Sequence, residues 1–163
     1  MSFGHRHDPT EIGQQHYMRA MANPQFTNVL RRPVTVNLSH DVPLLGGYSK
    51  NGRTIYIDKD APQIGGGLEK GIITHEHLEK TAKQVLGLRY HAKNGSHELA
   101  TAGEHDFVKN VLGMHPADYE KLWHPVIKHA ESKMGRSNLN LPPDLDMEPY
   151  SNDFRQRYAG LGG

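Results

Sequence analysis

Apolar and polar residues alternate in two short stretches in the first half of the chain. Residues 34–38 and 53–58 have the period of two that is typical of a half-buried strand. The pair Asn51-Gly52, a strong signal for a tight turn, directly precedes the second stretch. We therefore expect two strands, with residues 41–48 as a connection rich in turn chemistry.

The pattern changes to a helical period near residue 68. Apolar side chains then recur along one face as far as Leu86, and Gly87 is a suitable C-cap for this first long helix. A second helix is expected over residues 96–108, with Ser96 as its N-cap. A third opens at Pro116 and is expected to kink at Pro125. A small sheet followed by helices predicts an α+β fold.

Both ends of the chain differ in composition from this central part. Residues 1–32 are expected to form an N-terminal arm that carries one short helix, which ends at Asn23-Pro24. Residues 136–163 are rich in Pro, Asn and Gly and are expected to form an extended tail. Such segments commonly wrap partner proteins. We therefore divide the chain into an arm, a core over residues 33–135 and a tail.

Composition and charge exclude several kinds of chemistry. The formal net charge is +1, and no basic stripe favours nucleic acid or an anionic membrane. The start of the chain lacks the apolar run of a secretory signal, and no stretch approaches the ~18 apolar residues of a membrane span. We therefore expect a cytoplasmic protein. The chain has no Cys, so any metal must be held by His, Asp or Glu, a donor set that suits zinc.

The first long helix contains the sequence His75-Glu76-His77-Leu78-Glu79. A helix turns about 100° per residue, so the side chains at positions 75 and 79 lie one turn apart and within roughly 40° of each other. These two side chains are therefore candidate metal ligands on one rigid support. Glu76 lies on the flank of the pair, where it can act as a general base. His77 points about 200° away from His75 and is not expected to take part.

A hydrolytic zinc site needs a third protein donor and an open position for water. His97 is the best candidate, because it starts the second helix 18 residues after Glu79 and can project back toward the first. Glu104 lies on the same helix face as His97, two turns further on. We assign Glu104 as a partner that supports a ligand, or as a substitute third ligand.

A strand followed by a helix with His-Glu-x-x-ligand and a second ligand-bearing helix resembles the zincin metallopeptidases. The resemblance covers residues 34–111 and implies a zinc peptidase in which Glu76 is catalytic and His75, Glu79 and His97 are ligands. It also implies that strand 54–58 is an edge strand that pairs with a peptide substrate. The family pattern is His-Glu-x-x-His, whereas here Glu79 takes the place of the second His and His97 that of the Glu ligand. The organisation is also similar to that of small phage- and prophage-encoded proteins.

Two alternatives remain open at this stage. In the first, the motif is only the polar edge of an amphipathic helix, with Glu76–Lys80 and Glu79–Lys83 as ordinary ion pairs four residues apart. In the second, the chain is a non-catalytic structural or interaction protein, associated with a phage particle, whose arm and tail wrap a protein partner. If the chain is a hydrolase, Tyr90 or His105 could stabilise the oxyanion.

Overall fold

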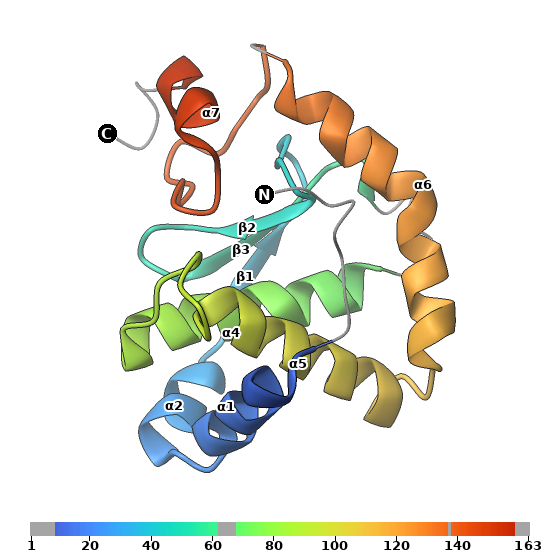
Figure 1. Cartoon of the computed structure of the whole chain (residues 1–163). Helices are drawn as coiled ribbons and strands as arrows, with labels where there is room; N and C mark the ends of the chain where they lie inside the picture. Colours follow the sequence, from blue (N-terminus) through green and yellow to red (C-terminus); the bar gives the residue numbers. More distant parts are fainter. Residues whose placement is uncertain (1–8, 62–67, 137, 159–163) are drawn as a thin grey trace.

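The computed structural model describes residues 9–61, 68–136 and 138–158, and combines helices with a small mixed sheet (Figure 1). The strands are β1 (Thr35–Asn37), β2 (Gly46–Tyr48) and β3 (Thr54–Ile57). The helices are α1 (Glu11–Met21), α2 (Pro24–Leu30), α4 (Glu69–Leu86), α5 (Ser96–Asn110), α6 (Pro116–Met134) and α7 (Asn152–Arg157). The α+β class predicted from the sequence is confirmed.

The three strands lie in the order β1-β3-β2, so β3 is the central strand. β1 runs parallel to β3 and β2 runs antiparallel to it. This corrects the expectation that strand 54–58 is an edge strand available to a peptide, because both of its sides are already paired within the sheet. The edge strand nearest to α4 is β2, in a segment that was expected to be a connection.

Two glycines allow β2 to lie in this position. A Cβ on Gly46 would lie 2.6 Å from Cγ2 of Ile72 on α4, and a Cβ on Gly47 would lie 2.8 Å from Cδ1 of Leu145 on the opposite side. No larger residue could bring the strand so close to both neighbours without displacing them. Glycine is disfavoured in strands because it has no side chain to pack, so the sequence pattern did not indicate a strand at residues 46–48.

Helix α4 lies between the sheet and α5 (Figure 1). Its face toward the sheet buries Ile72, and its face toward α5 buries Leu78 and Ala82. The helix ends as predicted at Gly87, whose φ of 68° is the left-handed conformation that glycine adopts without strain. Along one edge of α4, side chains of this helix therefore lie close to both the sheet and α5.

The described part of the N-terminal region packs on the core. α1 contacts α5, and α2 contacts α4. Phe26, on a helix that the sequence analysis did not predict, is fully buried together with Ala20. The expectation of an arm is therefore wrong for residues 9–32, since a helix that starts at Asn23-Pro24 brings the aromatic ring onto α4. Residues 1–8 lie outside the described part of the chain.

The C-terminal segment is also part of the core rather than an extended tail. Residues 139–158 include α7 and pack on the outer side of the sheet (Figure 1). Burial of one large apolar side chain contributes ~1.5–3 kcal/mol, so several together can offset the ordering of a Pro-rich segment. The buried side chains of this cluster are Val42, Tyr56, Leu139, Leu141, Leu145, Tyr150, Phe154 and Tyr158.

An ionic network attaches α6 to the end of the sheet. The buried Lys133 ammonium lies 2.7 Å from Asp41 Oδ1, 2.5 Å from Asp58 Oδ1 and 3.0 Å from Asp60 Oδ2. These bonds raise the pKa of Lys133, against the opposing effect of burial, so the side chain stays charged. α6 thus has a fixed position relative to β3, which matters because α6 also carries Tyr119 toward the site described next.

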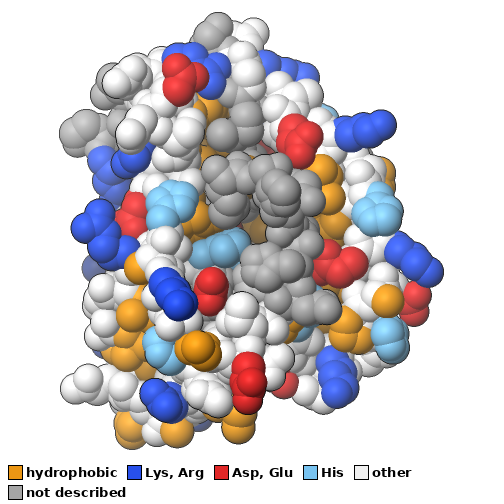
Figure 2. Space-filling view, in the orientation of Figure 1, with side chains coloured by type: hydrophobic (Ala, Val, Ile, Leu, Met, Phe, Trp, Pro, Cys, Tyr) orange, Lys and Arg blue, Asp and Glu red, His pale blue; other side chains and the backbone are white. Residues whose placement is uncertain are grey.

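Two surface properties bear on possible partners. On the face shown in Figure 2, Lys and Arg side chains occur at several places and acidic side chains lie among them. This distribution matches the net charge of +1. Among the helices of the described residues, none has both the length and the apolar character needed to cross a membrane.

Candidate metal centre

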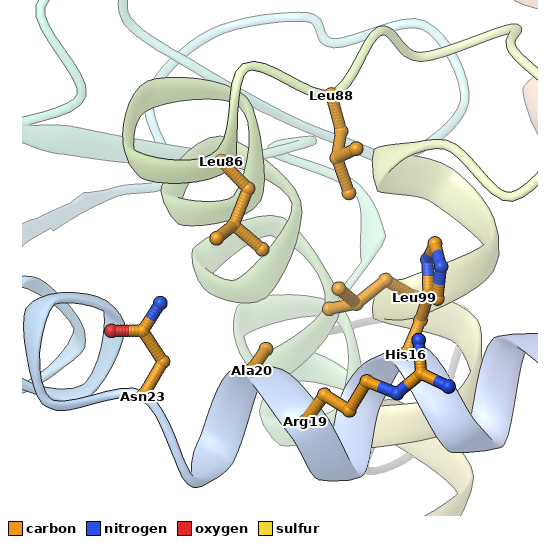
Figure 3. Close-up of a pocket in the computed structure, with 7 residues that line it drawn as sticks. All are labelled: His16, Arg19, Ala20, Asn23, Leu86, Leu88 and Leu99. Carbon is orange, nitrogen blue, oxygen red and sulfur yellow. The ribbon is translucent and has the colours of Figure 1, made fainter.

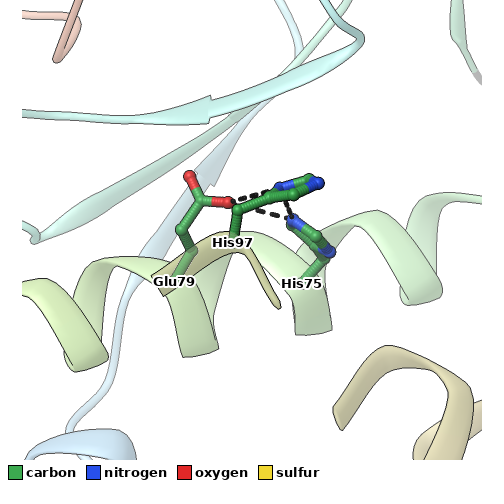
Figure 4. Close-up of side chains that lie close together, drawn as sticks. All are labelled: His75, Glu79 and His97. Atoms are coloured by element: carbon green, nitrogen blue, oxygen red, sulfur yellow. Dashed lines mark hydrogen bonds and ion pairs between the residues drawn. The ribbon is translucent and has the colours of Figure 1, made fainter. Parts of the chain in front are cut away.

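Three donor atoms from α4 and α5 converge on one point (Figure 4). His75 Nε2 lies 3.0 Å from Glu79 Oε2 and 3.2 Å from His97 Nδ1. The third side of the triangle, from His97 Nδ1 to Glu79 Oε2, measures 3.3 Å. The structure therefore brings together the three side chains that the spacing in the sequence singled out.

These separations are those of a metal site. Donors held 2.0–2.1 Å from a tetrahedral ion lie about 3.3 Å from one another, by simple geometry. The observed separations of 3.0–3.3 Å reach this value with shifts of a few tenths of an ångström. His75, Glu79 and His97 could thus hold a metal ion with little rearrangement.

Glu104 supports His75 and does not join the three donors. Its Oε1 accepts from His75 Nδ1 at 2.9 Å, which leaves Nε2 directed at the convergence point. Its Oε2 accepts from the Tyr119 hydroxyl at 2.5 Å. Gly71 makes this contact feasible, because a Cβ there would lie 2.0 Å from the Tyr119 oxygen. Of the two roles considered for Glu104, the structure favours the supporting one.

The charges of the buried residues determine the protonation states in the centre. Burial by itself lowers the pKa of His75, but the hydrogen bonds to Glu104 and Glu79 outweigh it and raise that pKa to about 10. Burial raises the pKa of Glu79, yet its bonds to His75 and His97 lower it to about 2. Burial lowers the pKa of His97. At neutral pH, His75 is therefore a cation between two carboxylates, and His97 offers a neutral nitrogen.

Glu76 is buried beside the three donors but is separate from them. It lies on the β2 side of α4, where a Cβ on Gly46 would come within 3.0 Å of its Cγ. Burial and then the negative charge of Glu79 raise its pKa well above the ordinary value. Neighbouring carboxylates whose pKa values are moved in opposite directions are typical of sites that use one as an acid–base group and the other as a fixed charge.

Two tyrosines, Tyr90 and Tyr48, lie around the donors. The Tyr90 ring packs on His97 with 4.8 Å between centroids. The Tyr48 hydroxyl is buried and, among the described residues, has no hydrogen-bond partner. Burial and the charges of Glu79 and Glu76 raise its pKa, so it remains a neutral donor. His105, the other oxyanion candidate from the sequence, instead lies 3.3 Å from Glu120 on α6.

The remaining motif residues do not support the interpretation of a simple polar helix edge. His77 is not among the three converging donors, as expected. Burial followed by the charge of Lys80 lowers its pKa to about 4. Lys80 donates to Thr81 Oγ1, and Lys83 pairs with Asp146 and Glu148. Neither lysine forms the ion pair with Glu76 or Glu79 that this interpretation requires, while both glutamates are buried.

A second group of metal-ligating side chains has a different explanation. Asp58, Asp60 and His129 lie close enough to share an ion. Lys133 already bonds both carboxylates, at 2.5 Å and 3.0 Å. Its ammonium supplies the positive charge that a metal would bring, so this group is a structural ion-pair network.

An apolar pocket of about 260 Å³ lies apart from the donors, between α1, the end of α4 and α5 (Figure 3). It is smaller than most ligand sites, and none of the residues that line it belongs to the metal centre. The lining residues are His16, Arg19, Ala20, Asn23, Leu86, Leu88 and Leu99.

Comparison with protein-family models, curated proteins and solved structures gave no match for this chain. The residues of the centre and their geometry therefore indicate the function on their own.

Proposed function

We propose that the protein is a zinc-dependent hydrolase of peptide or amide bonds. The observation that carries the proposal is the triangle of His75 Nε2, Glu79 Oε2 and His97 Nδ1, with sides of 3.0–3.3 Å, next to a separate buried acid, Glu76. Three protein donors with a separate carboxylate beside them are the arrangement of a hydrolytic zinc centre rather than of a closed structural one.

The donor set favours zinc over other ions. Two imidazoles and one carboxylate match zinc, whereas Mg²⁺ and Ca²⁺ prefer oxygen donors alone. Zinc bound there would make a bound water more acidic and would polarise a substrate carbonyl. Glu104 and Tyr119 would hold the imidazole of His75 in the orientation that binding requires.

Glu76 supplies the acid–base function. Its raised pKa makes the carboxylate a better proton acceptor than an ordinary glutamate, and burial keeps bulk water from competing. In the proposed reaction Glu76 takes a proton from the attacking water and then delivers it to the nitrogen of the leaving amine. The Tyr48 hydroxyl, buried and neutral, would donate a hydrogen bond to the oxygen that gains negative charge.

The substrate would approach along β2, because β3 is paired on both sides. The carbonyl of Leu45 and the amide of Ser49 bond to β3. By alternation, the main-chain groups of Gly46 and Tyr48 face away from β3. The Tyr48 carbonyl accepts from Asp146 N at 2.8 Å, so a peptide paired along the whole strand would have to displace this contact. Gly46 also lies against Glu76, so a peptide paired there would bring its main chain to the acid–base residue.

Zinc binding is expected to release about one proton at pH 6.5. Below its pKa of about 10, His75 carries a proton on Nε2 that zinc must displace, whereas the pKa of His97 is lowered and its ring is already mainly neutral. Zinc affinity should therefore rise about tenfold per pH unit from pH 6 to 8. Titration calorimetry in buffers of different ionisation enthalpy measures the proton count. A count of zero, with affinity independent of pH, would contradict this assignment of the protons.

Hydrolysis of fluorescently labelled casein tests the proposed function. The zinc-loaded protein should release labelled peptides, removal of zinc by a chelator should abolish this, and one equivalent of zinc should restore it. Protein that binds zinc with a 1:1 stoichiometry but is no more active than the chelated form on casein or on a peptide library would refute the proposal.

The alternative of a non-catalytic interaction protein depended on ends that are free to wrap a partner. The described parts of both ends bury their apolar side chains against the chain's own core. The described residues of the two ends therefore supply no free segment for wrapping a partner, and the scaffold, including one within a phage particle, stays a hypothesis.

A further inference from the structure

Residues 144–150, which we call the acidic strap, continue the sheet beyond β2. Asp146 N donates to the Tyr48 carbonyl at 2.8 Å, and Lys50 N donates to the Asp144 carbonyl at 2.8 Å. Ser49 and Leu145 form an antiparallel bridge between these two bonds. The strap thus binds the outer edge of β2 by main-chain hydrogen bonds, as an added peptide strand does.

Two carboxylates of the strap bind groups outside the sheet. Lys83 on α4 lies 2.7 Å from Asp146 Oδ2 and 2.5 Å from Glu148 Oε2. Glu148 Oε1 also accepts from the Tyr90 amide at 2.8 Å. Charge-assisted bonds of this length are stronger than those between neutral groups, and two of them share one lysine.

These contacts place the strap beside the metal centre. Lys83 follows Glu79 by one helical turn on α4. Tyr90, whose amide holds Glu148, packs its ring on His97. The strap therefore connects β2 with the α4–α5 connection, the two segments between which a peptide would have to lie to reach Glu76.

We propose that the β2 edge, Lys83 and the Tyr90 amide form a binding surface for extended acidic peptides, which the chain's own strap occupies as a built-in competitor. The consequence for catalysis rests on the proposed function: the zinc centre is closed to peptides until the strap moves. We expect this surface to bind peptides with two acidic residues separated by one position, because the strap presents Asp146 and Glu148 to the ammonium of Lys83.

The strap excludes other peptides because it is covalently attached to the protein whose surface it occupies. A segment attached to its own site acts at an effective concentration in the millimolar range, so a free peptide of micromolar affinity is outcompeted. Loosening the strap without altering Lys83 should expose the surface. The variant D146K/E148K does this, since it places two ammonium groups opposite a third. The variant D118K/D153K, which reverses two exposed acids on α6 and α7, is the matched control.

The test is fluorescence-anisotropy binding of a labelled peptide with the sequence of residues 143–151, with folding checked by circular dichroism. We expect D146K/E148K to bind the peptide at least tenfold more tightly than the wild type and the control do. Lys83→Glu provides a second variant, and it should prefer a peptide in which both acids are replaced by lysine. Equal binding by all four folded proteins, or no preference in Lys83→Glu, would overturn the proposal.

Activity separates this proposal from the proposed function. Zinc-loaded D146K/E148K should hydrolyse casein at least tenfold faster than the wild type does. If the variant binds both zinc and the peptide but hydrolyses nothing, the binding surface stands and the peptidase assignment is refuted. If wild type and variant hydrolyse casein equally, the strap does not control access.

Discussion

Replacing Glu76 by Gln is expected to reduce hydrolysis by ~10²–10⁴-fold, the usual contribution of a general acid–base group. Gln keeps the size of the side chain that packs beside Gly46, but it cannot accept the proton of the attacking water. Because Glu76 is not among the three converging donors, zinc affinity should change less than threefold. The measurements are casein hydrolysis and zinc titration on the same preparation.

The matched control is Glu69→Gln, the same chemical change two turns earlier on α4 and outside the centre. This variant should keep the wild-type rate. Loss of zinc together with activity in Glu76→Gln would show that Glu76 is a ligand. Retention of full activity with zinc bound would remove it from the mechanism.

Replacing His97 by Ala is expected to weaken zinc binding by at least about a hundredfold. Structural zinc sites bind with ~10–16 kcal/mol shared among four ligands, so loss of one costs on the order of 3 kcal/mol. The side chain of His97 is 28% exposed, so its removal should not unfold α5. Competition with a fluorescent zinc chelator measures the affinity, and circular dichroism verifies the helix content.

His77→Ala is the control for this experiment, because His77 is the histidine of the motif that faces away from the donors. It should bind zinc as the wild type does. If His77→Ala lost zinc and His97→Ala kept it, the helix face assigned to the ligands would be wrong.

The strongest periodic elements of the fold could be predicted from the sequence. α4, α5 and α6 appear where the helical period placed them, and β3 follows the turn at Asn51-Gly52. Ser96 is the first residue of α5 rather than its N-cap, which is Gly95. β2 could not be predicted from the sequence. Gly46 is needed there because its missing side chain lets the strand lie close to α4, and this contact between distant segments leaves no local pattern. The order of the strands is a tertiary property as well, so β3 was taken for an edge.

The two ends show the limit of arguments from composition. Residues 136–150 contain three Pro and two Asn, but Leu145 and Tyr150 are the residues that decide where this segment lies. Their partners, Val42 and Tyr56, are about a hundred residues earlier in the chain. No local sequence pattern indicates a contact between residues so far apart in the chain. At the N-terminal end, by contrast, Asn23-Pro24 was a local signal for the start of α2, but it was interpreted only as the end of the preceding helix.

The candidate site was more predictable than the fold around it. Helical spacing alone selected His75 and Glu79 and excluded His77, and chain reversal selected His97. The spacing could not predict the hydrogen bonds that hold His75 in place. Glu104, which bonds His75, is itself bonded by Tyr119 from α6, and Gly71 leaves room for the tyrosine. The buried Tyr48 hydroxyl was missed for the same reason, because its place follows from that of β2.

X-ray absorption at the zinc edge of the zinc-loaded protein tests the central claim most directly. We expect one zinc with four nitrogen or oxygen neighbours at about 2.0–2.2 Å, two of them with the outer-shell scattering of imidazole. His97→Ala should lose one imidazole from that signal. Six oxygen neighbours without imidazole scattering, or a spectrum unchanged by His97→Ala, would contradict a centre built from His75, Glu79 and His97.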